Sequence, residues 1–564
     1  MQGVTLLVKD VILVSLLITS LSLVKAQAIV QPKTILPNGS TQLQTTEITP
    51  IRGSITDRNG VVLAVTSQAH TVFADQNYVT DPIGEARKLA PLLKLDPAEL
   101  AEDLTGDDVY VVLKRNVSPL VWGRIAQLKL NGIYAETTLS RVYPEGSLGA
   151  NVLGFVNFEG EGAGGIENAL NSVLAGVAGE RRYTRVAGLE TADTMIKPAE
   201  DGKHVRLTIE RDIQWVAQQA IAERVKYARA ESGSVIVLNV KTGEVLAMAT
   251  APSFNPNDLS TANPKNLGNR VLSNAYEPGS TGKIMTMAAV IEEGVADPES
   301  QFVVPYKIKR TKETFSDHEY HKDLKLTLTG ILAQSSNVGS ILASERLPKL
   351  NQTIHSYWEK FGIGQSTGLN FPGENAGSLK DLNEWNASTA PTYAFGQGYS
   401  VNALQAASIF ATIANDGLRV TPSLIAGYTN NDGDFEAAAE TDSIRVVSES
   451  TAKKVRLMLE SVVSESGTAP NAKIPGYRVA GKTGTAEIWN NECNDYCDFM
   501  ASFIGMAPAD EPEIVVAVSI VKPKNGHYGG VLAGPVFKRV MSFALQQMRV
   551  PPTGTVAQKY AVKW

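Results

Sequence analysis

A serine and a lysine one helical turn apart are the first residues in this chain whose spacing suits nucleophilic chemistry. The segment 276–294 reads YEPGSTGKIMTMAAVIEEG and places Ser280 at the mouth of an expected helix, with Lys283 three residues later. Residues three apart lie on one helix face, so Lys283 could take the proton of the Ser280 hydroxyl. Ser280 could also be only an N-cap, with Gly294 ending the helix. The pair alone does not decide, because S-x-x-K also begins at Ser22, Ser450 and Ser519.

Two further motifs follow Ser280 and could supply the other groups that acyl transfer requires. Acyl transfer also requires a group that relays the proton to the leaving group, and donors that hold the oxyanion. One known solution places S-x-x-K, S-x-N and K-T-G in this order along a chain. Here that order is met by Ser280 with Lys283, Ser335 with Asn337, and Lys482 with Thr483 and Gly484.

The competing copies of these motifs fail on order or on local structure. Ser22 lies in a hydrophobic segment, and Ser519 lies in an expected strand, where residues three apart face opposite sides. Ser450 has no S-x-N between it and the K-T-G that follows. The other K-T-G, at Lys241, precedes every credible nucleophile and lies in an expected hairpin turn. Only the set that begins at Ser280 therefore predicts an acyl-transfer site.

The composition is that of a globular protein with more than one domain. The 564 residues are 43% hydrophobic and 20% charged, and this length predicts two or three domains. A net charge of −6 without a lysine- and arginine-rich stripe argues against nucleic acid as a partner. We expect no cofactor.

No metal site is expected either. His318 and His321, in DHEYH, lack the spacing of a zinc-protease motif. Cys493 and Cys497 are too few for a tetrahedral zinc site, which needs four ligands. We favour a local disulfide between them, with two free thiols as the alternative.

A hydrophobic segment at the N-terminus predicts export. Residues 11–24, VILVSLLITSLSLV, carry no charge, and a spanning helix of roughly 20 residues would have to extend back to Val4. The segment is either an uncleaved anchor or a signal peptide cut after Ala28, where AQA fits the small-x-small rule. We predict a single-pass protein of the cell membrane with its catalytic part on the extracytoplasmic side.

Patterning divides the rest of the chain. We predict a membrane segment at 1–28, a polar linker at 29–50, a mixed α/β domain at 51–204, a catalytic domain at 205–550 and a tail at 551–564. The catalytic domain begins with a periodic helix (212–228) and a hairpin, continues with helical stretches, and ends with three strands and a helix. This order is typical of an α+β domain in which both ends contribute to one sheet.

The motifs as they stand, EPGSTGK, SSN and KTGT, resemble those of the penicillin-binding proteins and serine β-lactamases. The N-terminal half narrows the resemblance to class B, monofunctional high-molecular-weight penicillin-binding proteins, and most closely to the division-associated penicillin-binding protein 3 group. The segments that carry this resemblance are RGSITDRNGVVLA (52–64), RVYPEGSLGANVLGF (141–155), GGIENALN (164–171), GEVLAMATAPSFNPN (243–257), GQGYSVNALQ (396–405) and YGGVLAGPVF (528–537).

The resemblance implies a fold and a role for each motif. The fold is a transpeptidase domain, with a central antiparallel sheet, helices on its faces and an all-helical part, preceded by an elongated mixed α/β domain. Ser280 is the implied nucleophile and Lys283 its base, while Ser335 and Asn337 relay protons and hold the substrate amide. Lys482 adds positive potential, and Thr483, Gly484 and Thr485 bind the substrate carboxylate. The oxyanion is expected between the backbone amides of Ser280 and Thr485.

The implied function is a D,D-transpeptidase that crosslinks septal peptidoglycan stem peptides, on nascent or lipid-linked glycan strands, and is acylated by β-lactams. A septal glycosyltransferase and division proteins are the implied partners. The alternatives are a β-lactam-hydrolysing enzyme or D,D-carboxypeptidase, and an idle β-lactam-binding sensor or division scaffold. The region 51–204 argues against a simple β-lactamase. We assign no chemistry to a set of residues that we predict to tie the N-terminal domain to the rest: Arg52, Asp57, Arg58, Arg141 and Glu167.

Overall fold

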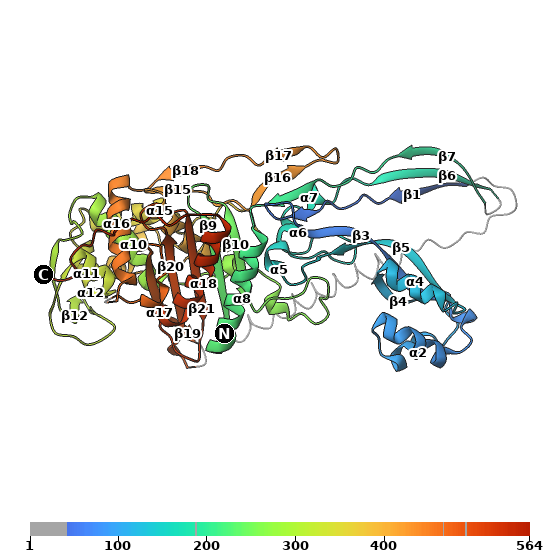
Figure 1. Cartoon of the computed structure of the whole chain (residues 1–564), viewed down its shortest axis with the longest axis horizontal. Helices are drawn as coiled ribbons and strands as arrows, with labels where there is room; N and C mark the ends of the chain where they lie inside the picture. The colour runs from blue at the N-terminus through green and yellow to red at the C-terminus, as the bar shows by residue number, and fades with distance from the viewer. Residues whose placement is uncertain (1–41, 187–188, 466, 491–492) are drawn as a thin grey trace, which may run out of the picture. The chain divides into compact units, whose positions relative to one another are not determined.

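The computed structural model describes residues 42–186, 189–465, 467–490 and 493–564 (Figure 1). The expected membrane segment and most of the expected linker lie outside these residues. Within them, no helix combines the length and the apolar composition needed to cross a membrane. The chain forms two compact units, of which the smaller takes in residues up to 49 together with 178–199, and the larger takes in 50–177 and 200–564.

The smaller unit is a three-stranded antiparallel sheet. It consists of β1 (Gln42–Ile48), β6 (Gly179–Val186) and β7 (Leu189–Lys197), in the order β1-β6-β7. β1 runs through the second half of the stretch expected to be a linker, and it pairs with β6 from Gln42 opposite Arg185 to Ile48 opposite Gly179. The prediction of a linker is wrong for these residues. Their Gln- and Thr-rich sequence can pair through backbone hydrogen bonds, and threonine fits a strand well.

The catalytic half of the larger unit is built around a five-stranded sheet. Its order is β10-β9-β21-β20-β19, with every neighbouring pair antiparallel. β9 (Ser232–Asn239) and β10 (Val245–Ala251) form the predicted hairpin, and β19 (Ala480–Asn490), β20 (Asp495–Ala507) and β21 (Ile514–Val521) come from the other end of the domain. The prediction that both ends of the domain share one sheet is confirmed.

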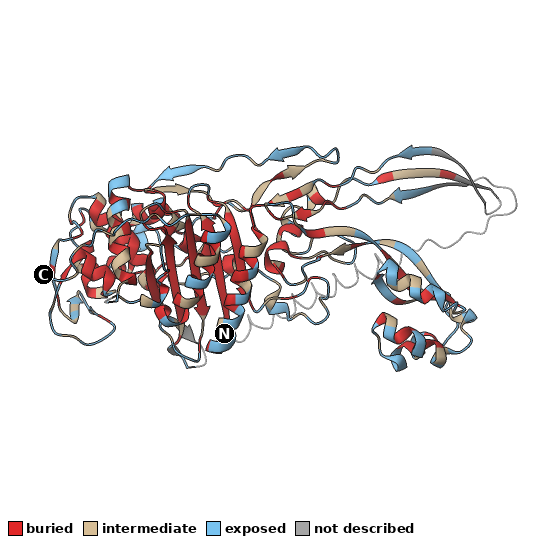
Figure 2. Ribbon diagram, in the orientation of Figure 1, coloured by how far each residue is buried: buried red, intermediate tan, exposed pale blue. Residues whose placement is uncertain are grey.

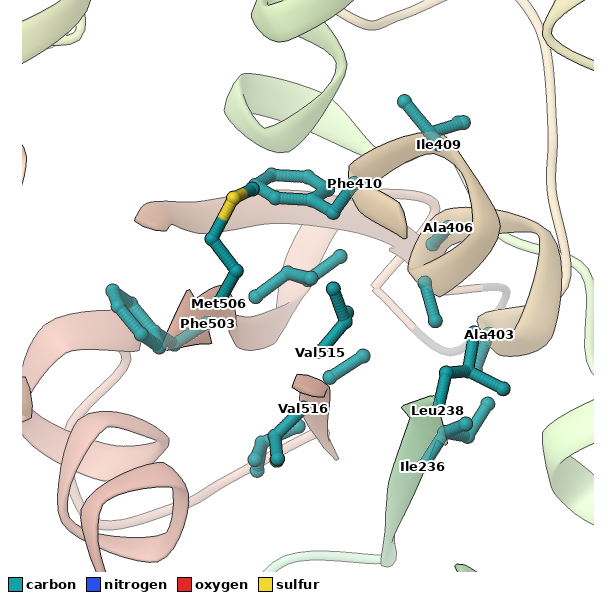
Figure 3. Close-up of a cluster of buried hydrophobic side chains, with 14 of the residues drawn as sticks. Ile236, Leu238, Ala403, Ala406, Ile409, Phe410, Phe503, Met506, Val515 and Val516 are labelled. Carbon is teal, nitrogen blue, oxygen red and sulfur yellow. The ribbon is translucent and has the colours of Figure 1, made fainter. Parts of the chain in front are cut away.

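Helices cover both faces of this sheet because its strands are apolar on both sides. Alternate residues of β9 face opposite ways. Ile236 and Leu238 lie toward α15 (Ala403–Ala414), whose Ala403, Ala406 and Phe410 share the core with them in Figure 3. A Cβ on Gly233 would instead meet Ile221 of α8 (Arg211–Ala228). The predicted terminal helix is α18 (Gly534–Gln547), and its Phe537 packs against Phe503 of β20.

An all-helical region follows β10 and carries the first two motifs. It contains α10 (Lys283–Glu292), α11 (Leu328–Ala333), α12 (Asn337–Ser344), α13 (Leu350–Lys360), α14 (Thr389–Ala394) and α16 (Glu449–Glu460). Two short hairpins interrupt it, β11 (Gln301–Val304) with β14 (Leu324–Thr327), and β12 (Lys307–Arg310) with β13 (Glu313–Ser316). Figure 2 shows that burial is concentrated in the five-stranded sheet and the helices around it.

A second sheet joins the N-terminal residues to the catalytic half. Its order is β17-β16-β8-β2-β3-β4, with β5 also paired to β3. The N-terminal strands are β2 (Ile55–Thr56), β3 (Val62–Ala74), β4 (Val111–Val117) and β5 (Ile133–Val142), and the others are β8 (His204–Leu207), β16 (Ile425–Thr429) and β17 (Phe435–Ala437). A separate small core forms where α2 (Pro82–Leu93), α3 (Pro97–Asp103) and α4 (Pro119–Gln127) pack on β3, β4 and β5.

The residues predicted to be structural ties make two sets of contacts. Glu167 is fully buried and accepts from both Arg52 Nε and Arg141 Nε at 2.7 Å. Asp57 accepts from the backbone of Arg211 at 3.3 Å, and Arg58 lies 3.5 Å from Glu244, so these two reach the catalytic half. The network around Glu167 also reaches the catalytic half, because the Tyr143 hydroxyl donates to Glu167 at 3.3 Å and the Tyr143 backbone makes two hydrogen bonds with the Asn257 side chain.

Candidate active site

Ser280 lies on a tight turn immediately before α10. The turn is a short 3-10 helix, Gly279–Gly282, and the Thr281 hydroxyl donates to Pro278 O at 2.7 Å. Gly279 has φ +55°, which glycine adopts without a Cβ penalty, and its backbone N–H donates to Gly396 O at 2.9 Å. Ser280 is partly exposed while Gly279 and Thr281 are buried. The buried residues on either side therefore fix the turn, while the Ser280 side chain remains accessible.

α10 ends as its sequence predicts. Gly294 has φ +67°, and Val295 N donates back to Val290 O at 3.1 Å. This is the left-handed glycine cap that commonly ends a helix.

Lys283 is fully buried and surrounded by acceptors. Its Nζ lies 3.0 Å from Ser280 Oγ, 2.5 Å from Ser335 O, 2.7 Å from Asn337 Oδ1 and 3.3 Å from Ser335 Oγ. A carbonyl oxygen and an amide oxygen can only accept, so they take the two N–H groups of a neutral amine. The lone pair of that amine is then left for the Ser280 hydroxyl. The geometry is that of a base hydrogen-bonded to its nucleophile.

Burial gives this lysine the protonation state that a base needs. Desolvation lowers the pKa of Lys283 to about 7, and the negative charge of Asp317 opposes this shift. About half of the molecules therefore carry a neutral Lys283 near neutral pH. Burial is therefore the leading cause of the depressed pKa of Lys283.

Ser335 lies at the junction between α11 and α12. Ser336 N donates to Ile331 O at 3.0 Å and Ser335 N to Leu332 O at 3.2 Å, which is a Schellman cap on α11. Ser335 itself has φ +60°, a conformation that a residue other than glycine rarely adopts. Ser336 then caps α12 by accepting from Gly339 N at 2.8 Å. Because two helices end and begin here, Ser335 can turn both its carbonyl and its hydroxyl toward Lys283.

Asp317 fixes the start of α12 and was not singled out from the sequence. Its carboxylate accepts from Asn337 N at 2.5 Å, from Val338 N at 3.0 Å and from Ser336 Oγ at 2.7 Å. His321, which the sequence offered only as half of a failed zinc motif, lies with Nε2 3.0 Å from the same carboxylate. Apart from the contact with His321, these contacts join Asp317 to residues about twenty positions away, so no local sequence signal marks them.

Lys482 brings the third motif to the same cluster from β19. Its Nζ is fully buried and donates to Ser335 Oγ at 2.9 Å and to Thr483 O at 3.0 Å. Burial lowers the pKa of Lys482 well below its ordinary value, and the nearby Lys283 lowers it further. Two amines and one serine hydroxyl thus form a chain from Ser280 through Lys283 and Ser335 to Lys482.

The remaining KTGT residues line the strand beside the nucleophile turn. Thr483 Oγ1 lies 2.8 Å from Thr468 Oγ1, and Thr485 is partly exposed and accepts from Gly529 N at 3.5 Å. A Cβ on Gly484 would stand 2.3 Å from Ser502 Oγ and 3.1 Å from Thr281 Cγ2. The glycine therefore lets β19 lie directly against the turn that carries Ser280.

The competing motif copies that the structure describes have structural roles. A further S-x-N occurs at Ser400–Asn402, and there Asn402 caps α15 by accepting from Gln405 N. Ser519 Oγ lies 2.6 Å from Ser234 Oγ inside the sheet, and Ser450 is exposed on α16. Cys493 and Cys497 form the favoured disulfide, which joins the turn before β20 to β20 itself. Within the described residues, no group of three or more histidine, cysteine or acidic side chains could hold a metal ion.

Comparison with known proteins identifies the family of both halves of the chain. Residues 233–542 match the penicillin binding protein transpeptidase domain, and residues 47–207 match the penicillin-binding protein dimerisation domain. Penicillin-binding protein PbpB of Mycobacterium tuberculosis is 36% identical over 90% of this chain and 80% of that protein. Peptidoglycan D,D-transpeptidase FtsI of Escherichia coli is 32% identical over 93% and 88%.

A solved structure agrees over nearly the same length. Penicillin-binding protein 3 of Mycobacterium tuberculosis, complexed with aztreonam, superimposes with a TM-score of 0.73 at 32% identity, covering 92% of this chain and all of that one. The fold and the site define a serine acyl-transferase of the transpeptidase type. The chain belongs to the class B penicillin-binding proteins, in the group of penicillin-binding protein 3, which confirms the resemblance predicted from its motifs.

Proposed function

We propose that this protein is a peptidoglycan D,D-transpeptidase of cell division in which Ser280 forms the acyl-enzyme and Lys283 is its base. The observation that carries the proposal is the buried amine of Lys283, 3.0 Å from Ser280 Oγ, with two acceptors that occupy its N–H groups. Its relatives include a named peptidoglycan D,D-transpeptidase and a penicillin-binding protein 3 complexed with a β-lactam.

Acylation begins with attack of Ser280 Oγ on the carbonyl carbon between the two terminal D-alanines of a stem peptide. Lys283 Nζ takes the hydroxyl proton as the new C–O bond forms. The oxyanion lies between the backbone N–H groups of Ser280 and Thr485, and each such donor typically lowers the barrier by about 2.7–4 kcal/mol. The C–N bond then breaks, and the departing amine of D-alanine receives a proton through the Ser335 hydroxyl.

The chain of amines explains why that relay can work. Ser335 Oγ accepts from Lys482 at 2.9 Å and lies 3.3 Å from Lys283, so its own proton is free to pass to the leaving group. An amine from a neighbouring stem peptide reverses the steps, forms the crosslink and restores the Ser280 hydroxyl. Asn337 holds the substrate amide, and Thr483, Gly484 and Thr485 hold the terminal carboxylate beside the Lys482 charge.

Location and partners follow from the sequence and extend this proposal. The hydrophobic segment 11–24 anchors the protein in the cell membrane with the catalytic domain on the extracytoplasmic side. The domain of residues 51–204 joins it to a septal glycosyltransferase and other division proteins, and residues 205–550 carry catalysis.

Labelling with a fluorescent penicillin tests the function. The wild-type protein is expected to form a persistent covalent adduct whose mass locates to Ser280, and Ser280→Ala should abolish it. Ser450→Ala, in the exposed S-x-x-K copy, is the matched control and should label normally. Rapid loss of label with release of hydrolysed drug would indicate a β-lactamase instead. Absence of labelling in the folded wild-type protein would indicate an idle sensor or scaffold.

Assay with paired stem peptides separates a transpeptidase from a carboxypeptidase. The expected product in the presence of an amine-bearing acceptor peptide is a crosslinked dimer, with one D-alanine released for each crosslink. Release of D-alanine without any dimer, at saturating acceptor, would overturn transfer to an amine in favour of transfer to water.

A further inference from the structure

The last residues of the chain lie against strand β14 of the β11–β14 pair and make one isolated β-bridge with it. Lys563 pairs with Leu326 of β14 in an antiparallel bridge, Thr327 N donates to Val562 O at 3.2 Å, and Trp564 N donates to Lys325 O at 3.4 Å. Trp564 Nε1 also donates to Phe302 O of β11 at 3.3 Å, and Lys325 Nζ lies 4.9 Å from the centre of the Trp564 ring. Figure 1 shows the C-terminus beside α11 and α12. The tail, expected only as a terminal segment, is thus docked on the helical region that carries the SSN motif.

The tail reaches the start of α11 through Thr327. This residue is the N-cap of α11, with its hydroxyl accepting from Gly330 N at 3.0 Å and donating to Ala561 O. Thr327 is 2% exposed, so its backbone N–H and its hydroxyl proton both depend on tail carbonyls. Loss of the tail would leave the first turn of α11 held by fewer partners.

Gly330 shows how closely the tail and α11 approach each other. A Cβ built on this glycine would stand 2.0 Å from Val562 O, and 3.0 Å from Val562 C. Any other residue must displace the tail, because the contact is with backbone and not with a flexible side chain. The glycine therefore lets residues 561–563 lie against the helix.

The other end of α11 carries Ser335. α11 has only six residues, from Leu328 to Ala333, and Ser335 and Ser336 donate their N–H groups to Leu332 O and Ile331 O. Ser335 is held with φ +60°, and its carbonyl oxygen receives a hydrogen bond from Lys283 Nζ. A shift of this short, fully buried helix along its axis moves the carbonyl and the hydroxyl of Ser335 relative to Lys283 and Lys482.

We propose that residues 560–564 are a positioning strap for catalysis: by docking on β14 and on the N-cap of α11, they hold Ser335 at the place where it orients Lys283 and relays protons. Thr327, Gly330 and Val562 are the positioning residues, and none of them touches the reacting atoms. The inference rests on the proposed roles of Ser335 and Lys283 but concerns a segment outside all three motifs.

Two different ways of removing the strap test this inference. A chain ending at Lys559 lacks the docked tail, and Gly330→Ala displaces the tail while placing a better helix former in α11. Each is expected to lower the acylation rate at saturating penicillin by about tenfold to a hundredfold, because misplacement of a catalytic group by about 1 Å can cost about a hundredfold. The dissociation constant of the non-covalent complex should change far less. Lys563→Ala is the matched control, since Lys563 is exposed and contributes backbone rather than its side chain, and it should acylate like wild type.

The combination of the two changes makes the test specific. If both act by removing the strap, Gly330→Ala in the shortened chain should cause no further loss of rate, which is a non-additive double-mutant cycle. Rates are measured per active site by titration with the penicillin, so misfolded protein does not count. Unchanged rates in the shortened chain, with only its Tm lowered, would overturn the proposal, and so would fully additive losses. The Ser280→Ala variant tests only the proposed function, because it removes the nucleophile without changing the tail. The shortened chain and Gly330→Ala test only the strap.

Discussion

The amine of Lys283 lies 3.0 Å from the hydroxyl of Ser280, and two oxygens that can only accept lie 2.5 and 2.7 Å from the same amine. A neutral Lys283 amine donates its two N–H groups to Ser335 O and Asn337 Oδ1, so its lone pair is left to accept a proton from the Ser280 hydroxyl. In the mechanism that we propose, the charge state of Lys283 decides whether the site can react. Burial, which lowers its pKa to about 7, places that decision in the physiological range.

The first prediction is that acylation rises with pH through neutrality. In the proposed mechanism the reactive form has a neutral Lys283, and the neutral fraction increases as pH rises through the pKa of about 7. The second-order acylation rate should therefore increase about tenfold between about pH 6 and about pH 8, and then level off. A stopped-flow measurement with a fluorescent penicillin at constant ionic strength checks this.

Lys283→Arg is the informative variant for this prediction. Arginine keeps the positive charge at all accessible pH values and cannot accept the serine proton, so acylation should fall by about 10²–10⁴-fold and lose its rise near pH 7. Lys453→Arg, on the exposed face of α16, is the control. A rate that falls as pH rises from 6 to 8 in the wild-type protein would exclude Lys283 as the base.

The second prediction concerns Asp317, which holds Ser336, Asn337 and Val338. Asp317→Asn keeps the volume but removes the negative charge that raises the Lys283 pKa. The midpoint of the pH–rate profile should therefore move to lower pH, while the plateau rate falls because the SSN segment is held less firmly. Asp317→Ala should lower the plateau further. The same stopped-flow series gives both quantities.

Asp323→Asn supplies the comparison for Asp317, because it removes a charge from the same loop. It should leave the midpoint and the plateau unchanged. A midpoint in Asp317→Asn that moves to higher pH would contradict the electrostatic role, and an unchanged plateau would contradict the positioning role.

Much of the fold and most of the site could be predicted because the evidence for them is local. Hydrophobic periodicity identifies helices α8, α15 and α18, and apolar runs identify strands β9, β10, β20 and β21. The order of three short motifs selects Ser280 among four S-x-x-K pairs. A motif records which residue types are needed at fixed spacing. Such a motif can be recognised without knowing which distant residues the fold brings into contact.

The contacts that sequence could not reveal join residues far apart in the chain. Asp317 contacts Asn337, which follows it after a loop, β14 and α11. The tail contacts β14, from which it is separated by more than half of the catalytic domain. Ser335 takes a left-handed conformation where α11 ends and α12 begins. β1 looked like a linker because its polar residues carry no amphipathic pattern, and its strand character depends on pairing with β6.

The third prediction is that Gly396→Ala disables the nucleophile turn. Gly396 has φ +96°, and a Cβ on it would stand 1.8 Å from Gly279 O. Its carbonyl accepts from Gly279 N at 2.9 Å, so the clash and the strained backbone both fall on the residue before Ser280. The acylation rate per folded molecule should fall about a hundredfold, since misplacement of a nucleophile by about 1 Å has that effect.

Gly268→Ala is the control for Gly396→Ala. A Cβ at Gly268 meets nothing within 4 Å, so acylation and stability should stay close to wild type. Normal acylation in a folded Gly396→Ala protein would show that the turn does not depend on this close approach.

The fourth prediction separates stability from catalysis through the buried ion pairs of Glu167. Arg52 and Arg141 each donate to this carboxylate at 2.7 Å, and Glu167 is fully buried. Glu167→Gln leaves two buried guanidinium groups without their counter-charge, and breaking a buried ion pair in this way costs about 3–5 kcal/mol. The Tm should drop by several degrees in differential scanning calorimetry. Glu159→Gln, at an exposed position of the same region, should leave the Tm unchanged.

Because the partners of Glu167 lie in the N-terminal residues, the acylation rate per titrated active site should equal that of the wild type at temperatures well below the transition. A variant that kept its Tm but acylated slowly would reverse this assignment and give Glu167 a role in the chemistry.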